Sequence, residues 1–238
     1  MPHLLISDNC LTGWRDVCSH IIANGDGFNL FLQINQPLLF TAQQTQEVVD
    51  SGLFTQDSIQ DVVNTIFPSK LYARNNGQPI TQFYDLHENI YLRGKTMHRK
   101  NRSRWGTYFL RFTKFGGNRV NQLENIIGAI NSRTNTQAAC YIMHVSSIDY
   151  DSNIRTIGGP CLQYVQFAQH NGTVNLTAVY RNHDFLNKAL GNYIGLSKLL
   201  EFVCNRTGKQ MGNILCHSIH YYLGQKRRVS QCLENLTW

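Results

Sequence analysis

The chain contains 238 residues, of which 42% are hydrophobic, 11% aromatic and only 16% charged. This composition excludes an intrinsically disordered protein, because disordered chains combine low hydrophobicity with high charge. A chain of this length can bury a sizeable core, and the sequence shows no linker-like or repeated segment. We therefore expect a single domain over residues 1–238, with a formal net charge of +7 that favours anionic partners.

The sequence gives no sign of a membrane span or a secretion signal. No segment approaches the roughly 18 apolar residues that a membrane helix requires, and residues 1–8 lack a basic start followed by a long apolar stretch. The 7 cysteines are scattered and form no C-x-x-C pair, which argues against a disulfide framework and against a zinc site. These features predict a cytoplasmic protein with no bound metal and no membrane partner.

The first predicted elements are a helix and a strand. Residues 12–23 have apolar positions at helical spacing, and Asn24-Gly25-Asp26-Gly27 is a helix-breaking segment. Residues 28–34 are then typical of a strand, which must end before Pro37.

Two short helices and a loop are predicted next. The apolar spacing indicates helices near 45–49 and 58–66. Residues 73–79 are rich in turn-forming residues, so we expect a loop that leads through a basic segment to Trp105.

The basic segment contains 6 Lys and Arg side chains and no acidic residue between positions 93 and 104: Arg93, Lys95, Arg99, Lys100, Arg102 and Arg104. Three explanations fit it, namely nucleic-acid phosphates, the phosphate of a small nucleotide, or exposure to solvent alone.

The second half of the chain has clearer periodicity. One helical face is formed by Leu123, Ile126, Ile127 and Ile130, and a strand is predicted over 139–145. Residues 190–203 predict a buried helix that ends near Gly208, and 212–222 predict a last strand.

A β-hairpin is predicted between these elements. Two strands, 161–168 and 174–181, flank Asn171-Gly172, and Asn-Gly is favoured in a type I′ turn because both residues accept positive φ. With antiparallel pairing and no repeated βαβ period, the sequence predicts an α+β fold: a mostly antiparallel or mixed sheet with helices packed on one face.

Cys161 lies at the start of a predicted strand, directly after Gly158-Gly159-Pro160. Glycine lets a backbone approach a ligand closely and proline stiffens the chain, so a cysteine here could act as a nucleophile. A free cysteine is more often a small buried hydrophobe, and position alone does not decide between these roles.

Further motifs follow Cys161 in order along the chain: Gln166-Phe167 in its strand, Arg181-Asn182-His183-Asp184 at the end of the next strand, Asn192, and His220-Tyr221-Tyr222. This series resembles the thymidylate synthase and pyrimidine hydroxymethylase superfamily, and the resemblance covers roughly residues 106–222. Trp105-Gly106-Thr107-Tyr108 is distantly similar to the family's Gly-x-x-Tyr motif.

The resemblance implies that Cys161 is a catalytic nucleophile and that Tyr108 lies near its thiol. A thiolate suits this role because it can add to C6 of a pyrimidine ring and leave again at neutral pH if its pKa is lowered. Arg181 would lower that pKa and bind phosphate. Asn192 would match the O4 and N3–H edge of a uracil, which it would favour over cytosine.

The resemblance also implies roles for the remaining motif residues. Asp184 would order water or the edge of the ring as part of the catalytic group, and Asn182 would contact substrate. His220 and Tyr222 would hold a sugar hydroxyl. The family further implies a homodimer whose interface is the sheet face without helices, and methylenetetrahydrofolate as the one-carbon donor.

Several positions depart from the family pattern. Leu162 replaces a histidine, Asn182 replaces a serine, and His217-Ser218 replaces a Gly-Asp pair. We find no match to the acidic, tryptophan-rich helix that carries the family's glutamate, and residues 231–238 do not resemble its folate-binding tail. The basic segment over 93–104 could supply phosphate ligands instead.

The first interpretation is a divergent enzyme that transfers a methyl or hydroxymethyl group to C5 of a uracil-type nucleotide or nucleoside. Two alternatives stay open: a nucleotide-binding or regulatory module without catalysis on the same fold, and a nucleic-acid-binding protein that uses residues 93–104. A cysteine hydrolase that pairs Cys161 with His217 or His220 is a further chemical option.

Overall fold

The computed structural model describes residues 2–75, 77–97, 105–132, 141–151 and 159–238. Their strands are β1 (His3–Ser7), β2 (Gly27–Ile34), β3 (Ile142–His144), β4 (Leu162–His170), β5 (Thr173–Tyr180), β6 (His183–Asp184) and β7 (Gln210–Tyr222). Their helices are α1 (Cys10–Asn24), α2 (Ala42–Asp50), α3 (Gln56–Ile66), α4 (Ser69–Arg74), α5 (Ile80–Met97), α6 (Tyr108–Thr113), α7 (Gln122–Ser132), α8 (Ile148–Asp151), α9 (Ala189–Thr207) and α10 (Lys226–Glu234).

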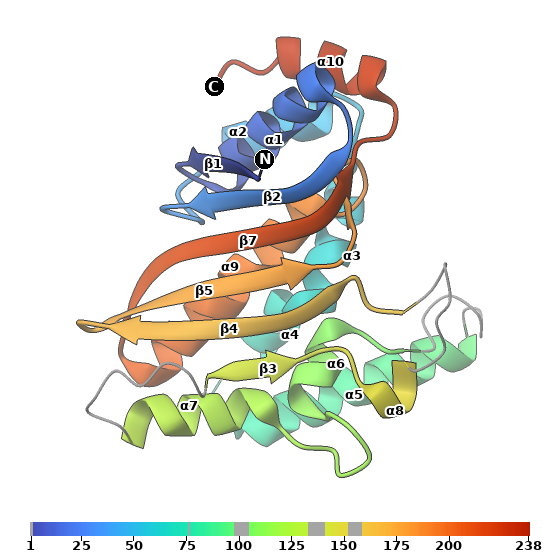
Figure 1. Ribbon diagram of the computed structural model, residues 1–238. Helices are drawn as coiled ribbons and strands as arrows, with labels where there is room; N and C mark the ends of the chain where they lie inside the picture. The colour runs from blue at the N-terminus through green and yellow to red at the C-terminus, as the bar shows by residue number, and fades with distance from the viewer. Residues whose placement is uncertain (1, 76, 98–104, 133–140, 152–158) are drawn as a thin grey trace.

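The strands of the described residues form one sheet in the order β1-β2-β7-β5-β4-β3, with β6 paired to β7 beside this path (Figure 1). The pairs β2–β7, β3–β4 and β4–β5 are antiparallel. The pairs β1–β2, β5–β7 and β6–β7 are parallel. The fold is therefore α+β with a mixed, open sheet, which agrees with the predicted α+β class and a mixed sheet; the parallel β1–β2 and β5–β7 pairs mean that antiparallel pairing does not dominate among the described strands.

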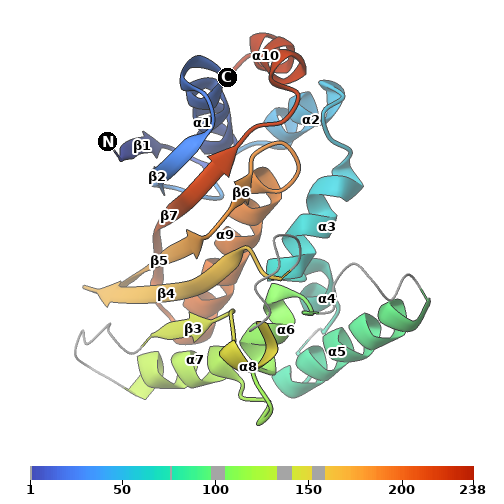
Figure 2. The same cartoon turned by 45° about the vertical axis from the view of Figure 1, so that its right-hand side comes forward.

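The described helices lie on one face of the sheet, with α9 and α3 behind the central strands (Figures 1 and 2). Leu30, Leu32 and Ile214 point toward this side and are fully buried. Neighbouring positions on β1 face the other way, and Leu4 and Ile6 are 62% and 59% exposed. One sheet face thus forms the core, and the other carries exposed apolar side chains.

Helix α9 packs closely against α3 because two glycines lie at their contact. A Cβ on Gly191 would lie 2.6 Å from Val62 Cβ, and one on Gly195 would lie 3.0 Å from Ile66 Cβ. These distances leave no room for a side chain, so the start of α9 is fixed against α3.

The structure confirms two predictions that rest on short sequence patterns: the turn of the β4–β5 hairpin and the end of helix α9. Asn171 and Gly172 have φ of 46° and 78°, as a type I′ turn requires. Gly208 ends α9 with φ of 64°, where its lack of a Cβ removes the steric cost of a left-handed conformation.

Other expectations were wrong. The loop expected over 73–79 begins later, because residues 73–74 belong to α4. Helix α5 was not predicted; it buries Phe83 and Tyr84 against the core despite its polar sequence. β1 and α10 were not predicted. The strand expected over 139–145 is described only as Ile142–His144, since residues 139–140 lie outside the described part of the chain.

Candidate functional site

Cys161 stands directly before β4, and the end of β5 holds its backbone. The backbone N–H of Arg181 donates to the carbonyl of Cys161 at 2.9 Å. The Arg181 Nε donates to the carbonyl of Pro160 at 3.1 Å. Gly159 has φ of 86°, and a Cβ there would lie 3.7 Å from Arg181 Nη2, so the guanidinium extends along this turn. The geometry brings the Arg181 charge beside the segment that carries the thiol.

The environment of the Cys161 thiol differs from that of the other cysteines. Among the described residues, five free cysteines are buried, and Cys161 alone is partly exposed. Burial is the largest influence on Cys161 and raises the pKa of its thiol above the usual value; Arg181 opposes this, Asp184 adds to it, and Lys188 opposes it. Arg181 lowers the pKa of the Cys161 thiol, as expected, but desolvation outweighs this positive charge and the net shift is upward.

Tyr108 lies next to Cys161, at the start of α6. Thr107 caps this helix by accepting the backbone N–H of Leu110 at 3.1 Å. The Tyr108 hydroxyl accepts the backbone N–H of Leu162 at 3.4 Å and also that of Cys161. Burial raises the pKa of Tyr108 well above its usual value, so the hydroxyl stays protonated and supports the backbone at the start of β4.

Asp184 follows the end of β5 by a few residues and organises its own turn. Its Oδ1 accepts the backbone N–H groups of Leu186 and Asn187, each at 3.0 Å. The carboxylate also interacts with the Tyr222 hydroxyl and, together with burial as the larger cause, raises the pKa of Tyr222 to about 12. Asp184 and Tyr222 are paired because β6 and β7 run in parallel here.

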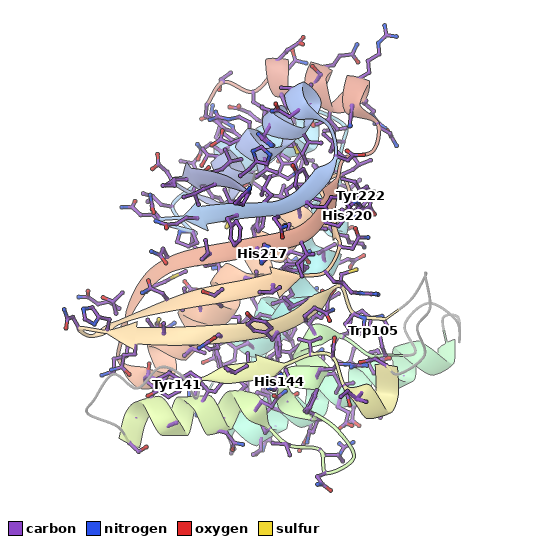
Figure 3. All side chains as sticks on the ribbon, viewed as in Figure 1. Trp105, Tyr141, His144, His217, His220 and Tyr222 are labelled. Atoms are coloured by element: carbon purple, nitrogen blue, oxygen red, sulfur yellow. The ribbon has the colours of Figure 1, made fainter. Side chains whose placement is uncertain are left out.

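His220 is paired with Asn182 across the same end of the sheet. The His220 Nδ1 lies 2.6 Å from Asn182 Oδ1, so Nδ1 carries the hydrogen and donates it. The His220 ring lies 5.0 Å from that of Phe28 and 6.0 Å from that of Tyr222. Figure 3 shows His220 and Tyr222 close together at the end of β7, whereas Trp105 lies on the other side of the start of β4.

Asn192 lies in the first turn of α9 and is only 4% exposed. Its Nδ2 is 3.2 Å from Nε2 of His183, a residue that sequence reasoning treated as a spacer between Asn182 and Asp184. His183 is 1% exposed, and its Nδ1 lies 2.8 Å from Ser218 Oγ. Its burial results from the pairing of β6 with β7, and no local pattern in the sequence predicts this pairing.

The basic segment is described only in part. Arg93 is an exposed residue of α5, whereas 98–104 lie outside the described residues and include Arg99, Lys100, Arg102 and Arg104. In the part of the chain that the structure describes, no group of acidic, histidine or cysteine side chains has the arrangement of a metal site. None of the helices within these ranges is long and apolar enough to cross a membrane.

The curated proteins to which this chain is similar all carry the same name. No family model matches the chain. The chain is 31% identical over 130 residues to a protein of Methanocaldococcus jannaschii named "Putative thymidylate synthase", an alignment that covers 51% of this chain and 59% of that protein. Proteins of the same name from Methanococcoides burtonii and Methanosarcina acetivorans are 32% and 33% identical over 117 and 105 residues. These alignments cover 49% and 43% of this chain, and 52% and 46% of those proteins.

The chain thus spans about half the length of the curated relatives it matches. The similarity recurs across several archaeal proteins that carry the same name, and it agrees with the motif series around Cys161. This chain is thus similar, over about half of its length, to archaeal proteins named "Putative thymidylate synthase".

Proposed function

We propose that this protein activates a uracil-type nucleotide or nucleoside by adding the Cys161 thiolate to C6 of the ring, so that a methyl or hydroxymethyl group can be transferred to C5. The observation that carries the proposal is the convergence of Cys161, Tyr108 and Arg181 on the start of β4. These residues come from three separate segments of the chain, and their meeting point holds the partly exposed thiol. The printed name of the relatives supports the same chemistry.

The addition step is balanced without a metal or an oxidant. The thiolate forms an S–C6 bond, and the electron pair of the C5–C6 double bond moves to C5 and the O4 carbonyl. C5 then takes up a proton or a one-carbon electrophile. Loss of the original C5 proton and departure of the thiolate restore the ring after proton exchange. After addition of a one-carbon group at the formaldehyde level, a hydroxymethyl product also requires water, and a methyl product also requires a hydride from the donor. The raised pKa of Cys161 means that the thiol must lose its proton first, which the positive charges of Arg181 and Lys188 favour.

The other residues of the cluster supply binding groups. Asn192 would contact the O4 and N3–H edge of the base, and Arg181 would bind a phosphate. The Asn182–His220 pair and Tyr222 would hold the sugar. Asp184 would order water at the ring, because it lies close enough to influence the Cys161 pKa while it supports its own turn.

The described residues do not form a recognisable folate site. The Trp105 ring lies 5.7 Å from the Arg111 guanidinium and 4.9 Å from the Tyr108 ring. Methylenetetrahydrofolate enters the proposal only as a donor to be supplied in the assay.

We further propose that the open sheet face is the interface of a homodimer. Leu4, Ile6 and Phe28 are 62%, 59% and 66% exposed on β1 and β2. No described helix covers the face that carries Leu4 and Ile6 (Figures 1 and 2), and exposed apolar groups of this kind mark interaction surfaces. A second copy of the chain would bury them.

A nucleotide-binding module without catalysis is the second candidate. The observation that favours it is the raised pKa of Cys161, since a thiol that stays protonated can line a site without attacking the base. This candidate predicts nucleotide binding without any exchange at C5.

Release of tritium from C5-labelled UMP, dUMP, CMP and dCMP, with and without methylenetetrahydrofolate, distinguishes the two functions. Exchange at C5 requires prior addition at C6. We expect release from a uracil nucleotide that is lost in Cys161→Ala and kept in Cys232→Ala, a control at a buried cysteine of α10. Binding of the nucleotides without release by the wild type would favour the binding module, and release by Cys161→Ala would exclude Cys161 as the nucleophile.

A further inference from the structure

His183 is a buried polar side chain to which the proposed chemistry assigns no role. Its ring stacks on Tyr180 with centroids 4.1 Å apart and planes 6° apart. The rings of Phe185 and Tyr193 lie 4.9 Å and 5.6 Å away. Aromatic rings from β5, from the chain after β6, and from α9 therefore hold the imidazole plane in place.

The two ring nitrogens of His183 have different partners. Nε2 faces the Asn192 amide nitrogen at 3.2 Å, and that nitrogen can only donate. Nε2 is therefore the acceptor, and the hydrogen lies on Nδ1, which donates to Ser218 Oγ at 2.8 Å. Ser218 is fully buried, and its hydroxyl in turn bonds to Cys216. Burial lowers the pKa of His183 to about 3, so the ring is neutral at physiological pH.

This arrangement couples the orientation of the Asn192 amide to the tautomer of His183: while the hydrogen is on Nδ1, the amide nitrogen must face Nε2. Turning the amide over would bring Oδ1 against the unprotonated Nε2, which places two acceptors in contact. Among the described residues, Oδ1 and the second hydrogen of Nδ2 have no partner, so one acceptor and one donor are left for a ligand. Tyr180 connects His183 to the site of the thiol. Its ring stacks on His183, and it interacts electrostatically with Cys161 and Tyr108.

An acceptor beside a donor distinguishes uracil from cytosine. Uracil presents N3–H as a donor and O4 as an acceptor. Cytosine presents N3 as an acceptor and its amino group as a donor, so it would need the amide in the reversed orientation. We propose that His183, held by Ser218, is a positioning residue that locks the Asn192 amide in the orientation for uracil and thereby excludes cytosine. This inference rests on the proposed function, because it requires Asn192 to contact the base.

The test compares affinities for dUMP and dCMP, measured by titration calorimetry. His183→Phe keeps an aromatic ring between Tyr180 and Phe185 but removes both hydrogen bonds. Ser218→Ala removes the partner of Nδ1 and the hydroxyl contact with Cys216 but leaves the imidazole in place, so it serves if the first variant folds poorly. His170→Phe is the matched control, because His170 is exposed at the hairpin between β4 and β5.

We expect the wild type and His170→Phe to prefer dUMP, and the other two variants to lose about tenfold of that preference, the effect of one misplaced hydrogen bond. An equal loss of affinity for both nucleotides would contradict the proposal that His183 orients the Asn192 amide, since it would show that His183 is only structural. If the wild type binds neither nucleotide, the proposed function itself fails and the inference falls with it.

The tautomer is measured independently of any ligand. In ¹⁵N-labelled protein, the His183 imidazole should show a hydrogen on Nδ1 and an unprotonated Nε2 that do not change between pH 5 and 9. A hydrogen on Nε2 would contradict the lock even if the nucleotide chemistry is correct.

Discussion

The backbone N–H of Arg181 donates to the Cys161 carbonyl at 2.9 Å, which joins the end of β5 to the residue before β4. The register of the hairpin thus determines which side chain lies beside the thiol. A shift by one residue would place Arg181 on the opposite face of its strand and remove its charge from the site. The position of the charge near Cys161 therefore follows from the Asn171-Gly172 turn together with the register shift between Leu162 and Tyr164.

Charges near Cys161 should move its pKa in opposite directions. Arg181→Gln removes a charge that stabilises the thiolate, so the pKa rises further and the fraction of thiolate at a given pH falls. Asp184→Asn removes a charge that disfavours the thiolate, so the pKa falls. The rate of alkylation of Cys161 by iodoacetamide, followed against pH by mass spectrometry, reports both shifts. Shifts in the same direction would show that the substitutions act through the fold and not through charge.

Tyr108→Phe should destabilise the protein and slow C5 exchange. The hydroxyl accepts backbone N–H groups at the start of β4, and leaving buried donors unpaired costs about 1–3 kcal/mol. Tyr193→Phe is the control, because the Tyr193 hydroxyl is buried with no partner among the described residues. Urea denaturation should show a loss for Tyr108→Phe and no loss for Tyr193→Phe. Equal effects would mean that the Tyr108 hydrogen bonds do not support the site.

Gly191→Ala should destabilise the protein by about 1–3 kcal/mol through overpacking. A Cβ there would meet Val62 Cβ at 2.6 Å and the Ile59 carbonyl oxygen at 3.0 Å. Gly128→Ala, in α7, has no atom within 4 Å of the added Cβ and should stabilise by about 0.5–1 kcal/mol. Thermal unfolding of both variants measures the difference, and equal melting temperatures would argue against the close contact of α3 and α9.

Ile6→Glu should dissociate the proposed homodimer, because it places a charge on the open sheet face. Leu86→Glu is the control, since Leu86 is 47% exposed on α5, on a helix and not on that face. Sedimentation equilibrium should give a dimer for the wild type and for Leu86→Glu, and a monomer for Ile6→Glu. A monomeric wild type would contradict the dimer.

The elements that the sequence predicts well are those with local causes. The turn at Asn171-Gly172 and the end of α9 at Gly208 depend on residues that tolerate positive φ, and both signals are contained in a few positions. In contrast, β1 is short and turns Leu4 and Ile6 to the open face, so its apolar residues do not mark the core. Helix α5 was missed because turn-forming residues before it and basic residues in it suggested a loop.

The candidate site divides in the same way. Cys161 and Arg181 could be proposed from the sequence, because each belongs to a short motif. The two motifs then meet in the structure through the hydrogen bond from the Arg181 N–H to the Cys161 carbonyl. The partnership of His183, Ser218 and Asn192 could not, because it depends on the pairing of β6 with β7 and on the packing of α9 beneath them. The effect of Arg181 on the pKa of Cys161 could be predicted from the motifs, but the larger effect of burial could not, because the extent of burial follows from tertiary packing.

The central claim is that the Cys161 sulfur adds to C6 of a pyrimidine. Incubation with 5-nitro-dUMP tests it most directly, because the nitro group withdraws electrons from the ring and stabilises the adduct without a one-carbon donor. The account predicts loss of the ring absorbance together with a mass increase of one nucleotide on the peptide that contains Cys161, in the wild type and in Cys232→Ala but not in Cys161→Ala. Absence of an adduct in the wild type, or an adduct on another cysteine, would contradict the account.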